Sequence, residues 1–324
     1  MESKEVGAFF GHRPIWPLGS VRRGTILVEF RGYSSKMRVD SHQHFWRYTP
    51  EEYGWIDDSM AVLRRDFLPK DLEAELKDGG FDATIAVQAQ HSLEETCWLL
   101  ELVDANPWIA GVVGWVDLRS PNVRAQLEQL TRNRKLVGIR HVVQAEPDDR
   151  FLLRPEFLRG IGLLQEFGLT YDILIYTRHL PVAAEFASRF PEQRFVLDHL
   201  AKPPIKAREL QAWEKGIRTL AKFPNMFAKL SGLVTEADWQ AWKPEDIRPC
   251  LDVAFDAFGS ERLMVGSDWP VCLVAGFYSR VMNVVMEYLE DFSSDERDAV
   301  LGGTAERFWK LSSRKSLPTR TVAS

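Results

Sequence analysis

Two histidines with one residue between them, His42 and His44, follow a short apolar segment that begins at Met37. Side chains two residues apart on a strand point to the same side, with about 6–7 Å of backbone between them. Asp40 has the same spacing, so we expect all three side chains on one face. Two neutral imidazoles side by side can bind a metal or polarise a carbonyl oxygen. Taken alone, the pair could equally be a chance pairing in a loop.

A repeated pattern of strands and helices must position these residues. From Met37 onward, short β-branched or aromatic runs alternate with helical segments. Strand plus crossover-helix spacing of this kind predicts an α/β fold, a (β/α)8 TIM barrel over residues 37–311, with C-terminal helices closing one end. An open doubly wound sheet is the alternative, but no G-x-G-x-x-G follows any strand. The predicted strands are 37–42, 83–88, 110–116, 136–141, 170–175, 194–199, 226–231 and 262–267.

The composition narrows the class of protein. The chain has 324 residues and a formal net charge of −5, which does not favour nucleic acid or an anionic membrane as a partner. An apolar run long enough to span a membrane is absent, and three scattered cysteines indicate a reducing compartment, so we expect a cytoplasmic protein. Residues 1–36 lack periodicity and are expected to form an extension outside the fold, with 312–324 as a tail. A homo-oligomer is compatible with these features.

Polar and aromatic residues gather where the predicted strands end. Chemistry in a (β/α)8 barrel takes place at the C-terminal ends of the strands. Four of the seven histidines lie there, although the barrel interior is normally a packed apolar core. Those histidines are His42, His44, His141 and His199, and the other candidates are Trp46, Gln88, Arg140, Asp172, Lys202, Asp268 and Trp269.

Three of these strand ends carry recognisable motifs, namely His42-x-His44, Asp198-His199-x-x-Lys202-Pro203 and Gly266-Ser267-Asp268-Trp269-Pro270. Together they resemble the amidohydrolase superfamily, and within it the sugar-lactonase branch, over residues 37 to about 311. The resemblance implies that the strand-one histidines, His199 and Asp268 converge at the barrel mouth. Metal-dependent members hold one or two divalent ions there, with a further histidine on strand five. Strand five of this chain carries Asp172 and no histidine, which argues against a two-ion centre.

The sequence therefore predicts a hydrolase that opens a sugar-derived lactone. Asp268 is the candidate general base, while His42, His44 and His199 would polarise the lactone carbonyl. We expect that no metal is required; a single divalent ion such as zinc, held by these four residues, is the alternative. The candidate substrate-binding residues are Trp46, Gln88, Arg140, His141, Asp172, Lys202 and Trp269, because indole faces suit sugar rings and a guanidinium can grip a carboxylate or hydroxyl.

Other interpretations of the same residues remain open at this point. Asp268 could cap a turn, His199 could be a satisfied core histidine, and Arg140 could pair with a carboxylate inside the mouth. A metal-dependent decarboxylase, or another amidohydrolase reaction, could use the same barrel. A barrel that has lost catalysis and acts as a binding protein is the third alternative.

Overall fold

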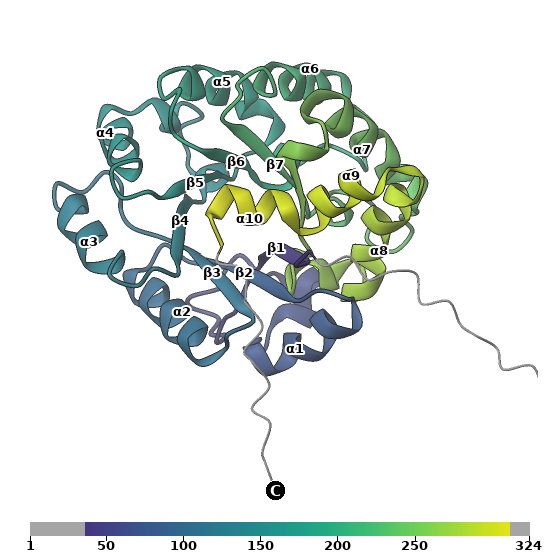
Figure 1. The fold of residues 1–324 in the computed structure, drawn as a ribbon, viewed down its shortest axis with the longest axis horizontal. Coiled ribbons are helices and arrows are strands. Elements are labelled where there is room, and N and C mark those ends of the chain that lie inside the picture. Colours follow the sequence, from purple (N-terminus) through teal and green to yellow (C-terminus); the bar gives the residue numbers. More distant parts are fainter. Residues whose placement is uncertain (1–35, 312–324) are drawn as a thin grey trace, which may run out of the picture. The chain divides into compact units, whose positions relative to one another are not determined.

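The computed structural model describes residues 36–311, so the predicted extension (apart from Lys36) and the predicted tail lie outside the described residues. Eight parallel strands neighbour one another in chain order, which confirms the predicted (β/α)8 barrel (Figure 1). The strands are β1 (Val39–Gln43), β2 (Ala83–Val87), β3 (Ile109–Gly114), β4 (Leu136–His141), β5 (Thr170–Ile173), β6 (Phe195–Leu197), β7 (Met226–Leu230) and β8 (Leu263–Val265).

Helices surround the barrel, and those that connect successive strands bury apolar side chains against it (Figure 1). Proline at the first position, whose missing N–H costs nothing there, begins α1, α4 and α7. Within residues 36–311 no helix is long and apolar enough to cross a membrane. The helices are α1 (Pro69–Asp78), α2 (Leu93–Ala105), α3 (Val123–Leu130), α4 (Pro155–Leu164), α5 (Leu180–Ser188), α6 (Gln211–Leu220), α7 (Pro244–Phe258), α8 (Tyr278–Tyr288), α9 (Ser294–Asp298) and α10 (Thr304–Trp309).

The barrel closes where β1 meets the segment that follows β8. The backbone N–H of Asp268 donates to the carbonyl of His42 at 2.8 Å, and the N–H of His44 donates to the carbonyl of Trp269 at 2.7 Å. Parallel pairing between Gln43 and Trp269 continues this seam. Two of the three sequence motifs are therefore joined by backbone hydrogen bonds, which fixes the first two histidines against Asp268.

A bulge in β1 changes which residues face the barrel axis. The pairing of β1 with β2 shifts register between Asp40 and Gln43. An extra residue in one strand reverses the side of the sheet on which later side chains emerge. Asp40 accepts hydrogen bonds from Ser267 and from Tyr278 of α8, whereas His42 contacts groups inside the barrel. The expectation that Asp40 shares one face with the two histidines is therefore wrong.

Helix α10 covers the end of the barrel at which the strands begin. In Figure 1 it crosses the ring of strands. Its Phe308 and Trp309 pack with Val39 and Met264, and the Trp309 indole N–H donates to the Thr170 hydroxyl at 3.1 Å. This is the predicted C-terminal closure, and it leaves the strands' C-terminal ends as the open end of the barrel.

Candidate active site

Four side chains predicted to act together, His42, His44, His199 and Asp268, meet at the C-terminal ends of the strands. Asp268 Oδ1 lies 3.4 Å from Nε2 of His44 and 3.8 Å from Nε2 of both His42 and His199. The Nε2 atoms of His42 and His44 are 3.2 Å apart. All four residues are buried, so the cluster forms a small polar centre within an apolar barrel.

His199 reaches this cluster from a left-handed turn. The four residues His199–Lys202 have φ values of 49° to 58°, a conformation that costs an L-residue about 1–2 kcal/mol. Side-chain donors hold the turn: the Trp213 indole N–H donates to the Leu200 carbonyl at 2.6 Å, and the Thr177 hydroxyl to the Lys202 carbonyl at 3.2 Å. Backbone strain that the surroundings maintain in this way is typical of functional sites.

The segment after β7 presses directly against His199. The Ser231 hydroxyl lies 2.9 Å from His199 Nδ1. Gly232, with φ of 61°, comes so close that a Cβ there would lie 2.5 Å from His199 Nδ1 and 3.2 Å from Asp268 Oδ2. These two residues contact the Nδ1 side of the imidazole, opposite the Nε2 atom that faces Asp268. Sequence reasoning assigned no role to Gly232, although a glycine directly after a strand that ends in serine was the available signal.

The donor atoms of the cluster fit a divalent ion. His44 Nδ1 lies 2.8 Å from the carbonyl oxygen of Val87, which can only accept, so Nδ1 carries the hydrogen and Nε2 presents its lone pair to the cluster. Four ligands held tetrahedrally at zinc would lie about 3.3 Å apart. The separations of His44 Nε2 from His42 Nε2 and from Asp268 Oδ1, 3.2 and 3.4 Å, match that geometry.

The protonation states at neutral pH follow from burial and neighbouring groups. Burial alone would raise the pKa of Asp268, but His199, His44 and His42 outweigh it and hold the pKa below its ordinary value. Burial lowers the pKa of His199 to about 4, despite the nearby carboxylates. An ionised carboxylate therefore lies beside the neutral imidazoles of His42 and His199, which suits either proton transfer from water or metal ligation.

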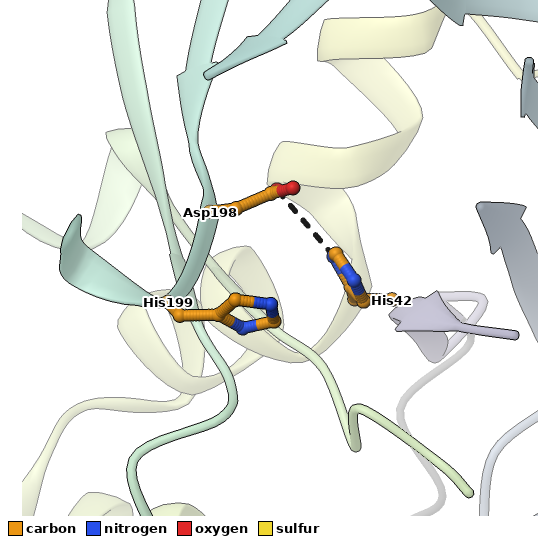
Figure 2. A group of neighbouring side chains, drawn as sticks. All are labelled: His42, Asp198 and His199. Carbon is orange, nitrogen blue, oxygen red and sulfur yellow. Dashed lines mark ion pairs between the residues drawn. The ribbon is translucent and has the colours of Figure 1, made fainter. Parts of the chain in front are cut away.

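Beneath the cluster lies a layer of paired charges. Figure 2 shows Asp198 pointing toward His42, with Asp198 Oδ1 3.4 Å from His42 Nδ1. Arg140 donates to Asp198 Oδ2 at 3.1 Å and to Gln88 Oε1 at 2.9 Å. Lys229 contacts both Asp198 and Asp172. Asp198 and Lys229 lay at predicted strand ends, but sequence reasoning did not include them among the site residues.

Three of the residues predicted to bind substrate, Gln88, Arg140 and Asp172, therefore already have buried partners within the protein. The same holds for both predicted tryptophans. Trp46 has no exposed surface, and its indole N–H donates to the Arg65 carbonyl at 2.9 Å. Trp269 is 2% exposed. For all five, substrate contact stays a prediction.

His141 lies in a separate aromatic stack rather than with the other histidines. Its Nδ1 accepts from the Trp115 indole at 3.2 Å, and its Nε2 lies 2.6 Å from Glu146 Oε1. His91 and Phe151 stack against its ring, with centroids 4.0 and 4.7 Å away. The structure thus places His141 on the side of β4 that packs toward the helices, while Arg140 points to the barrel axis.

Lys202 is the predicted substrate-binding residue that keeps partly exposed surface beside the cluster. Its Nζ lies 3.5 Å from Glu236 Oε1 and 5.5 Å from the centre of the Tyr176 ring. Burial raises the pKa of Glu236 above its ordinary value, although Lys202 lowers it. Sequence reasoning missed Glu236, which follows β7 in a short 3-10 turn (Val234–Glu236) that no motif marks.

An eight-stranded parallel barrel with histidines and an aspartate at its strand ends places the chain in the class of (β/α)8-barrel enzymes. A family model described as Amidohydrolase matches residues 39–311. The chain is 44% identical over 286 residues to an L-fucono-1,5-lactonase of Burkholderia multivorans, covering 85% of this chain and 96% of that protein. It is 37% identical over 280 residues to an L-fucono-1,5-lactonase of Burkholderia ambifaria, with coverage of 85% and 96%.

The chain belongs to the amidohydrolase family, and the prediction of a hydrolase is confirmed. A solved structure also supports membership of this family. A crystal structure of an amidohydrolase from Burkholderia multivorans with bound zinc has a TM-score of 0.81 and 44% identity, covering 85% of this chain and all of that one.

Proposed function

We propose that the protein hydrolyses a sugar-derived lactone of the L-fucono-1,5-lactone type. The observation that carries the proposal is the carboxylate of Asp268 within 3.8 Å of three imidazoles, in a chain that is 44% identical to an L-fucono-1,5-lactonase. Opening a lactone needs an acceptor for a water proton and a donor for the oxyanion that develops on the carbonyl. The cluster supplies groups of both kinds.

In the proposed reaction, Asp268 accepts a proton from the attacking water as the water oxygen bonds to the lactone carbonyl carbon. The ring C–O bond then breaks, and the released ring oxygen takes up the proton that Asp268 accepted, which leaves an open-chain hydroxy acid and the ionised carboxylate. Positioned proton transfer of this kind contributes about 10²- to 10⁴-fold to the rate. The ion pair of Lys202 and Glu236 would bind the sugar hydroxyls, because Lys202 follows His199 in the left-handed turn and keeps partly exposed surface.

We also propose that His42, His44, His199 and Asp268 bind one divalent ion. The close separations among His42, His44 and Asp268 support this alternative over the expectation that no ion is required, and a 44% identical structure contains zinc. When bound, such an ion would polarise the carbonyl and lower the pKa of water. The protein's own contribution is to hold the four ligands rigidly: Val87 fixes His44 and Ser231 fixes His199.

The first test is a pH-indicator assay over a panel of aldono-1,4- and aldono-1,5-lactones. The Asp268→Asn variant should lose at least about 10²-fold in kcat while keeping the circular dichroism spectrum of the wild type. Asp117→Asn, three residues after β3, is the matched control and should retain activity. Full activity of Asp268→Asn would exclude the proposed base.

Metal dependence is measured in the same assay after chelation. If chelation abolishes turnover and added zinc restores it, the result would support a bound ion. If turnover survives complete removal of metal, the result would support hydrolysis without a required ion. An absence of turnover on every lactone, with stoichiometric metal in the protein, would refute lactone hydrolysis.

A further inference from the structure

Lys229 places a positive charge inside the barrel, directly beneath the candidate active site. It lies on β7 and has no exposed surface. A buried ammonium is tolerated only where opposite charges and hydrogen-bond acceptors compensate its lost hydration. Its Nζ lies 2.9 Å from Asp198 Oδ1 and 3.1 Å from His42 Nδ1, and it contacts Asp172 Oδ2. The Trp309 ring of α10 lies below it, with its centre 5.4 Å from Nζ.

The three atoms around Nζ are groups that bind metal ions. Two carboxylate oxygens and one imidazole nitrogen converge on the ammonium, as they would on a divalent cation. Two sets of side chains in residues 36–311 lie close enough to share an ion around His42. One is the outer set, His42 with His44 and Asp268; the other is the inner set, His42 with Asp198 and His199 (Figure 2).

We propose that Lys229 is a built-in cation that occupies the inner position and keeps a divalent ion out of it. The ammonium already contacts two members of the inner set, Asp198 and His42, and an ion bound to both would have to occupy the same space. The outer position uses other atoms: Asp268 Oδ1 lies 3.4 Å from His44 Nε2 and 3.8 Å from His42 Nε2, whereas Lys229 Nζ lies at the Nδ1 atom of His42.

Asp172 completes this arrangement. It stands on β5, opposite Arg140 in the parallel pairing, and gives Lys229 a second carboxylate. Without the lysine, the carboxylates of Asp172 and Asp198 would face a cavity beside His42, and Arg140, which donates to Asp198, would offset only one of their two negative charges. Such a cavity favours a divalent ion. Removing the Lys229 ammonium should therefore create a metal site that the wild-type protein lacks.

The test is to count bound metal, which does not depend on activity. Wild type and Lys229→Met, which keeps side-chain length without charge, are loaded with Zn²⁺ or Co²⁺, dialysed and analysed by elemental mass spectrometry. We expect the variant to bind one equivalent more per chain than the wild type, and its Co²⁺ absorption spectrum to gain a second component. Lys202→Met, the same change at the barrel mouth, should bind the wild-type number.

The difference between the two proteins is the decisive quantity, because it separates this inference from the proposed outer ion. If the wild type binds no ion and the variant binds one, the proposed outer ion is refuted, but the role of Lys229 is supported. Equal counts in the two proteins, or two equivalents already in the wild type, would overturn the role of Lys229. If Lys229→Met does not fold, the double variant with Asp172→Asn keeps the local charge balanced. It must still gain an ion, with weaker affinity, for the inference to stand.

Discussion

Gly232→Ala should damage the active site far more than it damages the fold. The added Cβ would lie 2.5 Å from His199 Nδ1, whereas ordinary contacts begin near 3.4 Å, so the imidazole must retreat by about 0.9 Å. The same Cβ would lie 3.2 Å from Asp268 Oδ2, so it would also crowd the carboxylate of the cluster. A misplacement of about 1 Å in a catalytic group can cost 10²-fold. We therefore expect kcat/KM for the best lactone to fall by about 10²-fold.

The matched control is Gly168→Ala, in the turn before β5. Gly168 has φ of 71°, near the 61° of Gly232, but a Cβ there would meet nothing within 4 Å. Both variants should lose about 1–2 kcal/mol of unfolding free energy in urea titrations, because each forces alanine into a left-handed conformation. Only Gly232→Ala should also lose activity. Equal loss of kcat/KM in the two variants would refute the argument that backbone contact positions His199.

Two further predictions concern residues outside the cluster. Trp46→Phe should lower the unfolding free energy by about 1 kcal/mol through loss of its hydrogen bond to Arg65, with little change in KM; a tenfold rise in KM with unchanged stability would instead show that the indole binds the sugar. His141→Gln should gain stability relative to the wild type as pH falls from 6.5 to 4, by up to about 1.4 kcal/mol per pH unit. Burial lowers the pKa of His141 to about 4, so in this window the unfolded wild type binds a proton that the folded one does not. Urea titrations at pH 7 and 5 give the unfolding free energy of each protein, and the difference between the two proteins is compared at the two pH values. Taking the difference removes the effect of groups that both proteins share, such as Asp40, whose pKa burial raises to about 6. A difference that does not change with pH would contradict the prediction.

Much of the fold could be predicted because it depends on local periodicity. All eight predicted strands overlap the observed ones. The side of β1 from which Asp40 emerges was predicted wrongly, because the bulge in β1 has no sequence pattern as simple as the alternation of apolar and polar residues along a strand. The convergence of His42, His44, His199 and Asp268 could be expected, since parallel strands in a barrel bring their C-terminal ends together.

The neighbours of those four residues could not be predicted in the same way. His199 enters the site through a left-handed turn of non-glycine residues, a conformation that sequence preferences argue against and that only tertiary contacts maintain. Trp46 follows the His42-x-His44 motif in the sequence, but the packing of its ring against Phe67 and Tyr53 is visible only in the structure. Proximity to a motif in the chain does not determine on which side of the loop a ring packs.

Asp172 shows most clearly how sequence and structure differ as sources of information. In the sequence, strand five carries Asp172 and no histidine, which argued against a centre with two metal ions. In the structure, Asp172 contacts Lys229, which lies 57 residues further along the chain, so the carboxylate is one half of a buried ion pair. Charge balance links the two residues: a histidine at position 172 would leave the ammonium with one carboxylate fewer in a low-dielectric interior. The missing histidine and the buried lysine are then parts of one arrangement, in which a side chain of the protein provides the inner positive charge.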